Sequence, residues 1–569
     1  MQTQSASALF SQWKPIEIML ALLFLIAPFY HHEHIGGMGL RISNNVTVWI
    51  VANIIGWISL YIGLIRQKIY LPKYFRYIAA FPVFATVSGF VTGVDNPMEW
   101  LFRLLFIWCG LLFFLGLFQH KLSQGRVDRI LFIFVISALM QGLIGIAQIL
   151  FVNQDLILFP KSYYGVPFGM FEQINNQAIY QVTAFVVAIY LITRPYIVKG
   201  AVWRKIVLLS FFCVSSFIIS YSGSRAGTLA ILLSLPFAII GRRYFLLKYK
   251  RLTFLSLIFV LVSGGFGSSG FITVSDKMAD IANGYSTSAR LGIYAVSLDL
   301  IKEKPLFGHG IGSFTNKWQF EKAEFYNTHP NMHLIEGYVT HPHNELFFWA
   351  IESGVVGIIG IFIFLLGIGL TLAKTQVNMR WGIYLSFLIP IMLHTQVELP
   401  FHLSALHWFL ALFLLFVLMR SNSQYSQVNL SKAALLSSRT MSLFMLVLGT
   451  VFLFHTLLSS YELGDPRRNV WQTPHAKVNP YFSDIVESTQ MKSLLQFAMK
   501  NKVAEDVEAF AQWGEDYLPK EPSANLLTLI ILAYQDLGKK DDMCRIMHTA
   551  YGIYPFNDDF IRGIEHCKN

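Results

Sequence analysis

Two histidines, an asparagine and a glutamate stand together where a polar stretch becomes a long apolar one. The run extends from His341 to Glu345 (HPHNE) and continues directly into the apolar residues that begin at Leu346. Ionisable groups at a membrane edge are costly, so they are usually paired or functional. A histidine titrates near neutrality and can take a proton from a hydroxyl group. The alternative is that these residues only anchor the end of a helix at the interface.

Two arginines could supply positive charge to a phosphorylated substrate. Arg225 closes the turn Ser-Gly-Ser-Arg, and a serine-rich turn that opens a helix presents free N–H groups suited to a phosphate. Arg290 lies in a polar loop, where an arginine is usually solvated. Hydroxyl, amide and carboxyl groups complete the set of polar candidates: Gln173, Asn175, Ser222, Ser224, Asn344 and Glu398. Of these, Gln173 and Asn175 could hydrogen-bond a sugar. Taken singly, each could equally cap a helix or finish a loop.

Several other patterns predict no cofactor and no metal site. Gly308, Gly310 and Gly312 suggest a phosphate loop, but no strand is predicted before them, so a turn with close packing is the better interpretation. The histidines at 31, 32 and 34 lie in a short loop without spaced partners. The sequence also has no Asp-x-Asp pair and no Walker-type Gly-x-x-x-x-Gly-Lys-Ser/Thr motif. Metal-held sugar nucleotides and ATP-driven transport are therefore not expected.

The composition is that of a membrane protein. Of 569 residues, 54% are hydrophobic, 15% aromatic and only 14% charged, and the mean hydropathy is +0.50. A soluble fold could not bury so much apolar surface, so we predict an all-α polytopic integral membrane protein. The net charge of +11 comes from basic residues in short loops between apolar runs. That pattern indicates membrane orientation and argues against nucleic-acid binding.

The apolar runs predict about 12 to 13 transmembrane helices, since a span needs about 20 apolar residues. The candidate spans are 16–30, 46–65, 77–93, 99–118, 129–151, 177–193, 206–221, 227–240, 252–274, 346–373, 381–397, 404–419 and 441–458. With the N-terminus inside, the inner loops hold most lysines and arginines, whereas the outer loops hold little beyond Arg41, Lys161 and Arg225. All the candidate residues then fall on the outer side, which predicts a single site there.

Two larger segments are also predicted on the outer side, a loop at about 275–343 and the tail at 461–569. We therefore divide the chain into a membrane domain, 1–460, and a helical tail domain, 461–569. In the tail, Leu526–Leu537 and Asp542–Tyr554 flank Gly538 and resemble a tetratricopeptide-type hairpin. Such a module could bind another macromolecule or simply cap the membrane part. Cys544 and Cys567 could form a disulfide if the tail is outside the cytoplasm.

Taken together, these motifs resemble those of the O-antigen ligase and polymerase superfamily. They are Gly169…Gln173-x-Asn175, Ser222-x-Ser224-Arg225, Arg290-Leu291…Pro305-Leu306-Phe307-Gly308-x-Gly310 and His343-Asn344-Glu345-Leu346…Glu352-x-Gly354. The helical tail and His394…Glu398-Leu399-Pro400-Phe401-His402 are similar to bacterial O-linked protein oligosaccharyltransferases of the PglL/PglS type. The chain departs from the family at Glu172-Gln173-Ile174, where Gly-Gln-Pro is more usual, and at Tyr294, where Trp is common.

This resemblance implies a membrane fold like that of the GT-C glycosyltransferases, in the bacterial inner membrane, with site and tail facing the periplasm. It also implies transfer of a glycan from undecaprenyl diphosphate to a Ser/Thr hydroxyl of a periplasmic or pilin-like protein, without metal or cofactor. Arg225 and Arg290 would hold the diphosphate, His343 would act as base, and Gln173 and Glu398 would shape the sugar or acceptor side.

Three alternatives stay open. An O-antigen ligase would use lipid A-core as acceptor, and an O-antigen polymerase would use another lipid-linked glycan. A transporter of lipid-linked sugars is a different class of protein. It should have paired, interrupted helices at mid-membrane depth, and the sequence pattern indicates none.

Overall fold

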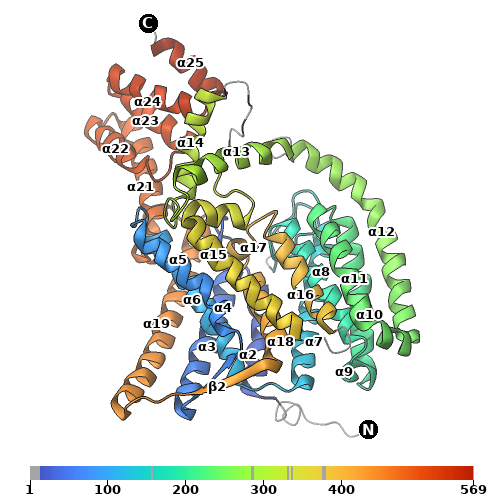
Figure 1. Ribbon diagram of the computed structural model, residues 1–569. Coiled ribbons are helices and arrows are strands. Elements are labelled where there is room, and N and C mark those ends of the chain that lie inside the picture. Colours follow the sequence, from blue (N-terminus) through green and yellow to red (C-terminus); the bar gives the residue numbers. More distant parts are fainter. Residues whose placement is uncertain are drawn as a thin grey trace. The chain divides into compact units, whose positions relative to one another are not determined.

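A computed structural model describes residues 13–154, 158–282, 287–329, 332, 334, 337–374 and 380–567. Parts of the loop predicted at about 275–343, namely 283–286, 330–331, 333 and 335–336, lie outside these ranges. The described chain is almost entirely helical (Figure 1). A helix satisfies its own backbone hydrogen bonds, which is the condition for an apolar segment to exist in lipid.

Each of the predicted spans overlaps a helix. The helices are α2 (Pro15–Leu25), α3 (Ser43–Arg66), α4 (Phe75–Ile78), α5 (Ala80–Val91), α6 (Pro97–Phe118), α7 (Gln124–Leu150), α8 (Ile174–Leu191), α10 (Val202–Tyr221), α11 (Arg225–Lys248), α12 (Lys250–Ala282), α15 (Glu345–Lys374), α16 (Arg380–His394), α18 (Ala405–Met419) and α19 (Lys432–Gly464). Within the described ranges, nine helices are long and apolar enough to cross a membrane, and three shorter apolar segments accompany them. The prediction of an all-α, multi-pass membrane protein is confirmed.

The chain forms two compact units. The first unit comprises Met1–Ala79, Ile107–Asp280 and Phe364–Asp465, and the second comprises Ala80–Phe106, Ile281–Ile363 and Pro466–Asn569.

Helix α8 is the centre of the first unit. Every residue from Asn176 to Leu191 is buried, and α7, α10, α11 and α16 all contact the helix. A helix that is buried along its whole length must be covered on all sides by its neighbours. Its first turn is therefore held in a fixed place, and the candidate residues Gln173 and Asn175 stand at that turn.

A short antiparallel ribbon was not predicted. Strand β1 (Lys68–Pro72) pairs with β2 (Ser423–Gln427), with Tyr70 opposite Tyr425. The two strands are only five residues each and lie far apart in the sequence. Strands this short carry too few residues for an alternating pattern to be recognised.

The second unit joins the large loop to the tail. Helices α13 (Thr287–Glu303) and α14 (Phe314–Thr328) precede α15, and the tail continues in α21 (Ser483–Asn501), α22 (Ala504–Tyr517), α23 (Ala524–Asp536), α24 (Lys540–Ile553) and α25 (Asp558–Cys567). Helix α14 packs against α24 (Figure 1). There the fully buried Lys322 places its ammonium nitrogen 4.3 Å from the centre of the Tyr554 ring. Helices α23 and α24 form the predicted hairpin around Gly538.

A disulfide links Cys544 of α24 to Cys567 of α25, as predicted. The bond spans 23 residues, and a cross-link of that length removes about 3 kcal/mol of chain entropy from the unfolded state.

We expect that replacing both cysteines by alanine will lower the stability of the tail by about that amount. The same replacement at the unpaired Cys109 and Cys213 is the control. Hydrogen exchange of α25 is the measurement, and equal protection with and without the bond would contradict the expectation.

Candidate functional site

The sequence-predicted residues are divided between the two units. Gln173, Asn175, Ser222, Ser224, Arg225 and Glu398 lie in the first, and Arg290, His343 and Asn344 lie in the second. The structure brings the first group together. The combination of both groups in one site stays a prediction.

Buried glutamines of α7 hold the loop that leads into α8. The side-chain amide of Gln148 donates to the Gly169 carbonyl (2.9 Å) and accepts from the Gly169 N–H (2.8 Å). Gln141 accepts from the Met170 N–H (2.9 Å). Gly169 has φ +61°, and a Cβ there would lie 2.6 Å from Oε1 of Gln141, so only glycine fits. Sequence reasoning missed these glutamines, although amides inside an apolar helix are themselves a signal of function or pairing.

The unusual Glu172-Gln173-Ile174 segment keeps the shape that Gly-Gln-Pro would have. Glu172 has φ +55°, the left-handed conformation that favours glycine. Gln173 is the N-cap of α8, and Ile174 is its first residue, the position at which proline is most common. The backbone at 172–174 therefore has conformations that Gly-Gln-Pro would also favour.

Gln173 and Glu398 are directly paired. Nε2 of Gln173 donates to Oε2 of Glu398 over 2.9 Å, and Glu398 is 4% exposed. Within the described chain, the buried Oε1 of Gln173 has no hydrogen-bond partner. A buried acceptor without a partner is uncommon in a native structure, so this oxygen is available to a hydroxyl group of a substrate.

The serines build the turn before α11. Ser224 is the N-cap of α11, accepting from the Gly227 N–H (3.1 Å), and its hydroxyl donates to Oδ1 of Asn175 (2.7 Å). Ser222 accepts from the Ser224 N–H (3.3 Å) and donates to the Ile219 carbonyl (2.9 Å). The three side chains predicted to bind substrate here are thus already hydrogen-bonded within the protein, and they tie the starts of α8 and α11 together: Asn175, Ser222 and Ser224.

Arg225 is the first residue of α11 and is exposed. In the described chain it has no ion pair. The amino end of a helix carries partial positive charge, so a cation placed there is unfavourable by itself. The free N–H groups and the guanidinium instead combine to attract an anion. Because the start of α8 is tied to the same turn, two positive helix ends and Arg225 converge.

The N-terminal histidines have a partner that the sequence did not indicate. Nε2 of His34 contacts Oε1 of Glu172 at 2.8 Å, and the ligand atoms of His31, His34 and Glu172 lie within 4.8 Å of one another. The prediction that they lack partners is wrong, because Glu172 is distant in sequence. Nδ1 of His34 accepts from the Gly36 N–H (3.1 Å), which leaves the proton on Nε2 to donate to Glu172. A metal-bound histidine normally donates through its second nitrogen, so the contact is better explained as a hydrogen bond.

In the second unit, Arg290 lies in the first turn of α13 and is half-buried. Like Arg225, it has no ion pair among the described residues. Four residues further on, Tyr294 stacks on Phe347 of α15, with ring centres 4.8 Å apart and planes at 18°. Tyr294 therefore supplies the flat aromatic surface that the more common Trp would supply.

His343 is held in a left-handed backbone conformation with φ +52°. Such residues are uncommon outside glycine and concentrate at functional sites. Asn344 caps α15, because its Oδ1 accepts from the N–H groups of Leu346 (2.9 Å) and Phe347 (3.1 Å). Nδ1 of His341 accepts from the His343 N–H at 3.3 Å. His341 thus supports the backbone that presents His343.

Helix α15 is interrupted at Gly354, where φ is +60° and ψ is −161°. The loop at 305–310 restores the lost backbone pairing: the Val355 N–H donates to the Pro305 carbonyl (2.8 Å), and the His309 N–H donates to the Ile351 carbonyl (2.8 Å). A Cβ at Gly308 would lie 2.5 Å from that carbonyl oxygen. The glycine-rich loop is therefore a site of close packing, as predicted.

The sequence pattern indicates no paired, interrupted helices, and the single break at Gly354 was not predicted, because it depends on a loop that lies outside the helix. A transporter would need a second such break in a corresponding helix. Among the helices that the structure describes, α15 alone has one.

A buried ion pair supports the start of α15 and was not predicted. Nη1 of Arg103 lies 2.6 Å from Oε2 of Glu352, and Glu352 is fully buried. Oε1 of Glu352 accepts from the Phe314 N–H (3.2 Å), and the Arg103 guanidinium lies 4.7 Å from the centre of the Phe348 ring. One carboxylate thereby ties together α6, α14 and the segment of α15 that follows His343.

The fold is that of a multi-pass membrane protein, and several of the candidate polar residues stand at helix starts. Residues 208–362 match the O-antigen ligase family, and residues 383–563 match the virulence factor membrane-bound polymerase family, C-terminal part. The two matches support the O-antigen ligase superfamily, whose members are membrane enzymes that transfer glycosyl groups. The first match contains Arg225, Arg290 and His343. No curated protein matches the chain significantly.

Proposed function

We propose that the protein is an O-oligosaccharyltransferase that moves a glycan from undecaprenyl diphosphate to a Ser/Thr hydroxyl of a periplasmic or pilin-like protein. The observation that carries the proposal is Arg225, exposed and without an ion pair at the joined starts of α8 and α11. An anionic group would satisfy both the helix ends and the guanidinium.

In the proposed step, the acceptor oxygen attacks the anomeric carbon of the first sugar. The bond from that carbon to the phosphate oxygen breaks, and undecaprenyl diphosphate leaves with the electron pair. Arg225 and Arg290 stabilise the negative charge that grows on the leaving diphosphate, since a guanidinium binds phosphate in a bidentate manner and does not lose its own proton.

The acceptor hydroxyl must lose a proton during the same step. His343 takes that proton as general base. Its left-handed backbone, supported by His341 and by the Asn344 cap, holds the imidazole at the start of α15. Gln173 contributes its unpaired Oε1 to a sugar or acceptor hydroxyl, and Glu398 orients the Gln173 amide.

The chain is proposed to lie in the bacterial inner membrane with its tail, 461–569, in the periplasm. The Cys544–Cys567 disulfide supports this, because such bonds persist mainly outside the cytoplasm. A reporter joined after residue 569 is expected to be active only in the periplasm, and one inserted at 242–251 only in the cytoplasm. The opposite pattern would separate the tail from the predicted side of the site.

The acceptor is tested by supplying alternatives side by side. In cells that make a lipid-linked glycan, we expect a pilin-like protein to become glycosylated and lipid A-core to remain unmodified.

Because the tail is proposed to bind the acceptor, removal of 461–569 is expected to abolish transfer to protein, provided that membrane insertion is unchanged. Modification of lipid A-core alone would identify a ligase. Growth of the lipid-linked glycan itself would identify a polymerase.

A further inference from the structure

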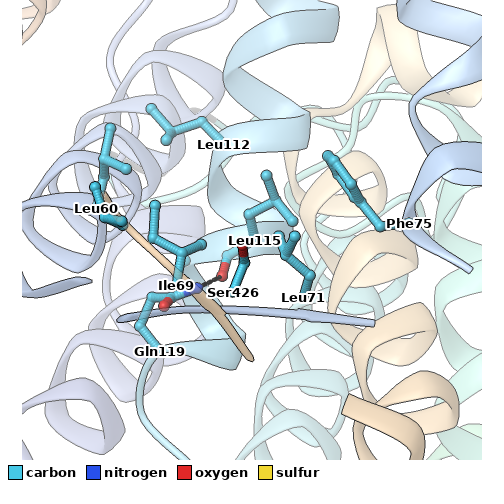
Figure 2. Close-up of a pocket in the computed structure, with 10 residues that line it drawn as sticks. Leu60, Ile69, Leu71, Phe75, Leu112, Leu115, Gln119 and Ser426 are labelled. Atoms are coloured by element: carbon cyan, nitrogen blue, oxygen red, sulfur yellow. Dashed lines mark hydrogen bonds between the residues drawn. The ribbon is translucent and has the colours of Figure 1, made fainter. Parts of the chain in front are cut away.

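A cavity of about 290 Å³ lies in the first unit, and none of the candidate residues of the site lines it (Figure 2). Its walls come from α3, the β1–β2 ribbon, α4 and α6, through Leu60, Leu71, Phe75, Leu112 and Leu115. Gln119 also lines it, but its amide donates to the Tyr70 carbonyl and accepts from the Tyr70 N–H, both at 2.9 Å. With that amide occupied, the cavity suits a hydrocarbon chain and not a polar ligand.

The surroundings of the cavity are cationic. Residues 54–79, 107–127 and 399–440 contain no Asp or Glu, and exposed basic side chains flank the ribbon at Arg66, Lys68, Lys73, Arg76 and Lys121. Tyr70 and Tyr425 face each other across the ribbon, with ring centres 5.9 Å apart. Tyrosines beside lysines and arginines are typical of a membrane interface.

Two lysines, Lys73 and Lys374, stand next to residues of the segment that lines this cavity. Lys73 lies between Leu71 and Phe75, both of which line the wall, and its ammonium group is close enough to that of Lys374 to lower the pKa of Lys73 below its ordinary value. Lys374 also lies 5.4 Å from the centre of the Tyr74 ring. Neighbouring like charges repel, and a shared anion would remove the repulsion.

We propose that the cavity binds one acyl chain of an anionic membrane phospholipid whose phosphate is held between Lys73 and Lys374. We assign the cavity and the lysine pair to one ligand because Lys73 is two residues from each of the wall residues Leu71 and Phe75. The predicted orientation places this site on the inner side of the membrane, where basic pockets between helices attract anionic lipid headgroups.

The test is a lipid titration of the full-length, delipidated protein in detergent, followed by native mass spectrometry. Dioleoyl phosphatidylglycerol is the anionic probe, and dioleoyl phosphatidylcholine has the same chains without net charge. We expect the first phosphatidylglycerol to bind on the order of 10-fold more tightly. The double variant Lys73→Gln, Lys374→Gln should abolish that preference. Lys248→Gln is the matched control, since Lys248 is also exposed and ends helix α11.

The acyl chain is tested separately. Ser426→Phe fills the cavity mouth from an exposed strand position and should weaken both lipids while the preference for negative charge persists. Dihexanoyl phosphatidylglycerol should bind the unaltered protein much more weakly than the dioleoyl form. This comparison of chain lengths needs no variant. Equal binding of both chain lengths, or full competition by inorganic phosphate, would overturn the acyl-chain assignment. An unchanged preference in the double variant would overturn the headgroup assignment.

Discussion

Replacement of His343 is expected to reduce glycan transfer by about 10²- to 10⁴-fold, the usual contribution of a positioned general base. His343→Gly is the sharper variant, because φ is +52° at this position and glycine adopts that conformation without strain. The glycine variant removes the imidazole and keeps the backbone conformation of the loop. Arg225→Ala is expected to cost about 10²- to 10³-fold, and Arg225→Lys should recover little, because an ammonium group lacks the bidentate fork.

His341 is the matched control for His343, from the same loop. The substitution His341→Ala removes the hydrogen bond to the His343 N–H and the contact between the two imidazole rings, whose centres are 4.3 Å apart. It is expected to reduce transfer by less than about 10-fold, in line with the net value of one hydrogen bond. Transfer should be insensitive to EDTA. If His341 proved essential and His343 dispensable, the base would be assigned to the wrong histidine. If neither mattered, Glu398 would be the next group to examine.

Breaking the Arg103–Glu352 pair is expected to have the largest effect on stability. Glu352→Ala leaves the Arg103 charge without its buried partner, and removal of one member of a buried pair typically costs about 3–5 kcal/mol. It also frees the Phe314 N–H and loosens the segment of α15 that follows His343. We therefore expect a lower unfolding temperature in detergent together with weaker transfer.

The double variant Arg103→Met, Glu352→Leu separates charge burial from packing. With both charges removed, no buried ion is left unpaired and only the exposed Glu99 loses a partner, so most of the lost stability should return. Arg562→Ala, which breaks the exposed pair with Asp559, is the control and should leave the unfolding temperature unchanged. A double variant no more stable than Glu352→Ala would show that the pair acts through geometry and not through charge.

The membrane helices were predictable because each of them corresponds to one continuous apolar run in the sequence. The hairpin of the tail was also predictable, because Gly538 marks the turn between α23 and α24 within a few residues of both. The contacts that build the site were not predictable in this way. Gln173 meets Glu398, and Arg103 meets Glu352, across more than 200 residues, and no local periodicity records such a pairing.

The serines of the turn before α11 illustrate a second limit. Their position at a helix start was clear from the sequence, but the direction of each hydroxyl was not. The Ser224 hydroxyl joins Asn175 to the cap of α11. Its proposed effect on the substrate is therefore indirect, because Ser224 positions Arg225. Similarly, Gly354 resembles the other glycines of α15 in sequence. Only the docking of the 305–310 loop distinguishes it.

The left-handed Glu172 also has a consequence for how the family can vary. A glycine at this position needs no support, because its backbone is free to adopt the conformation. A glutamate is strained there by about 1–3 kcal/mol and is held by His34. The two positions are therefore expected to vary together among related chains. Where position 172 is acidic, position 34 should be histidine, and where position 172 is glycine, the residue at position 34 should be variable.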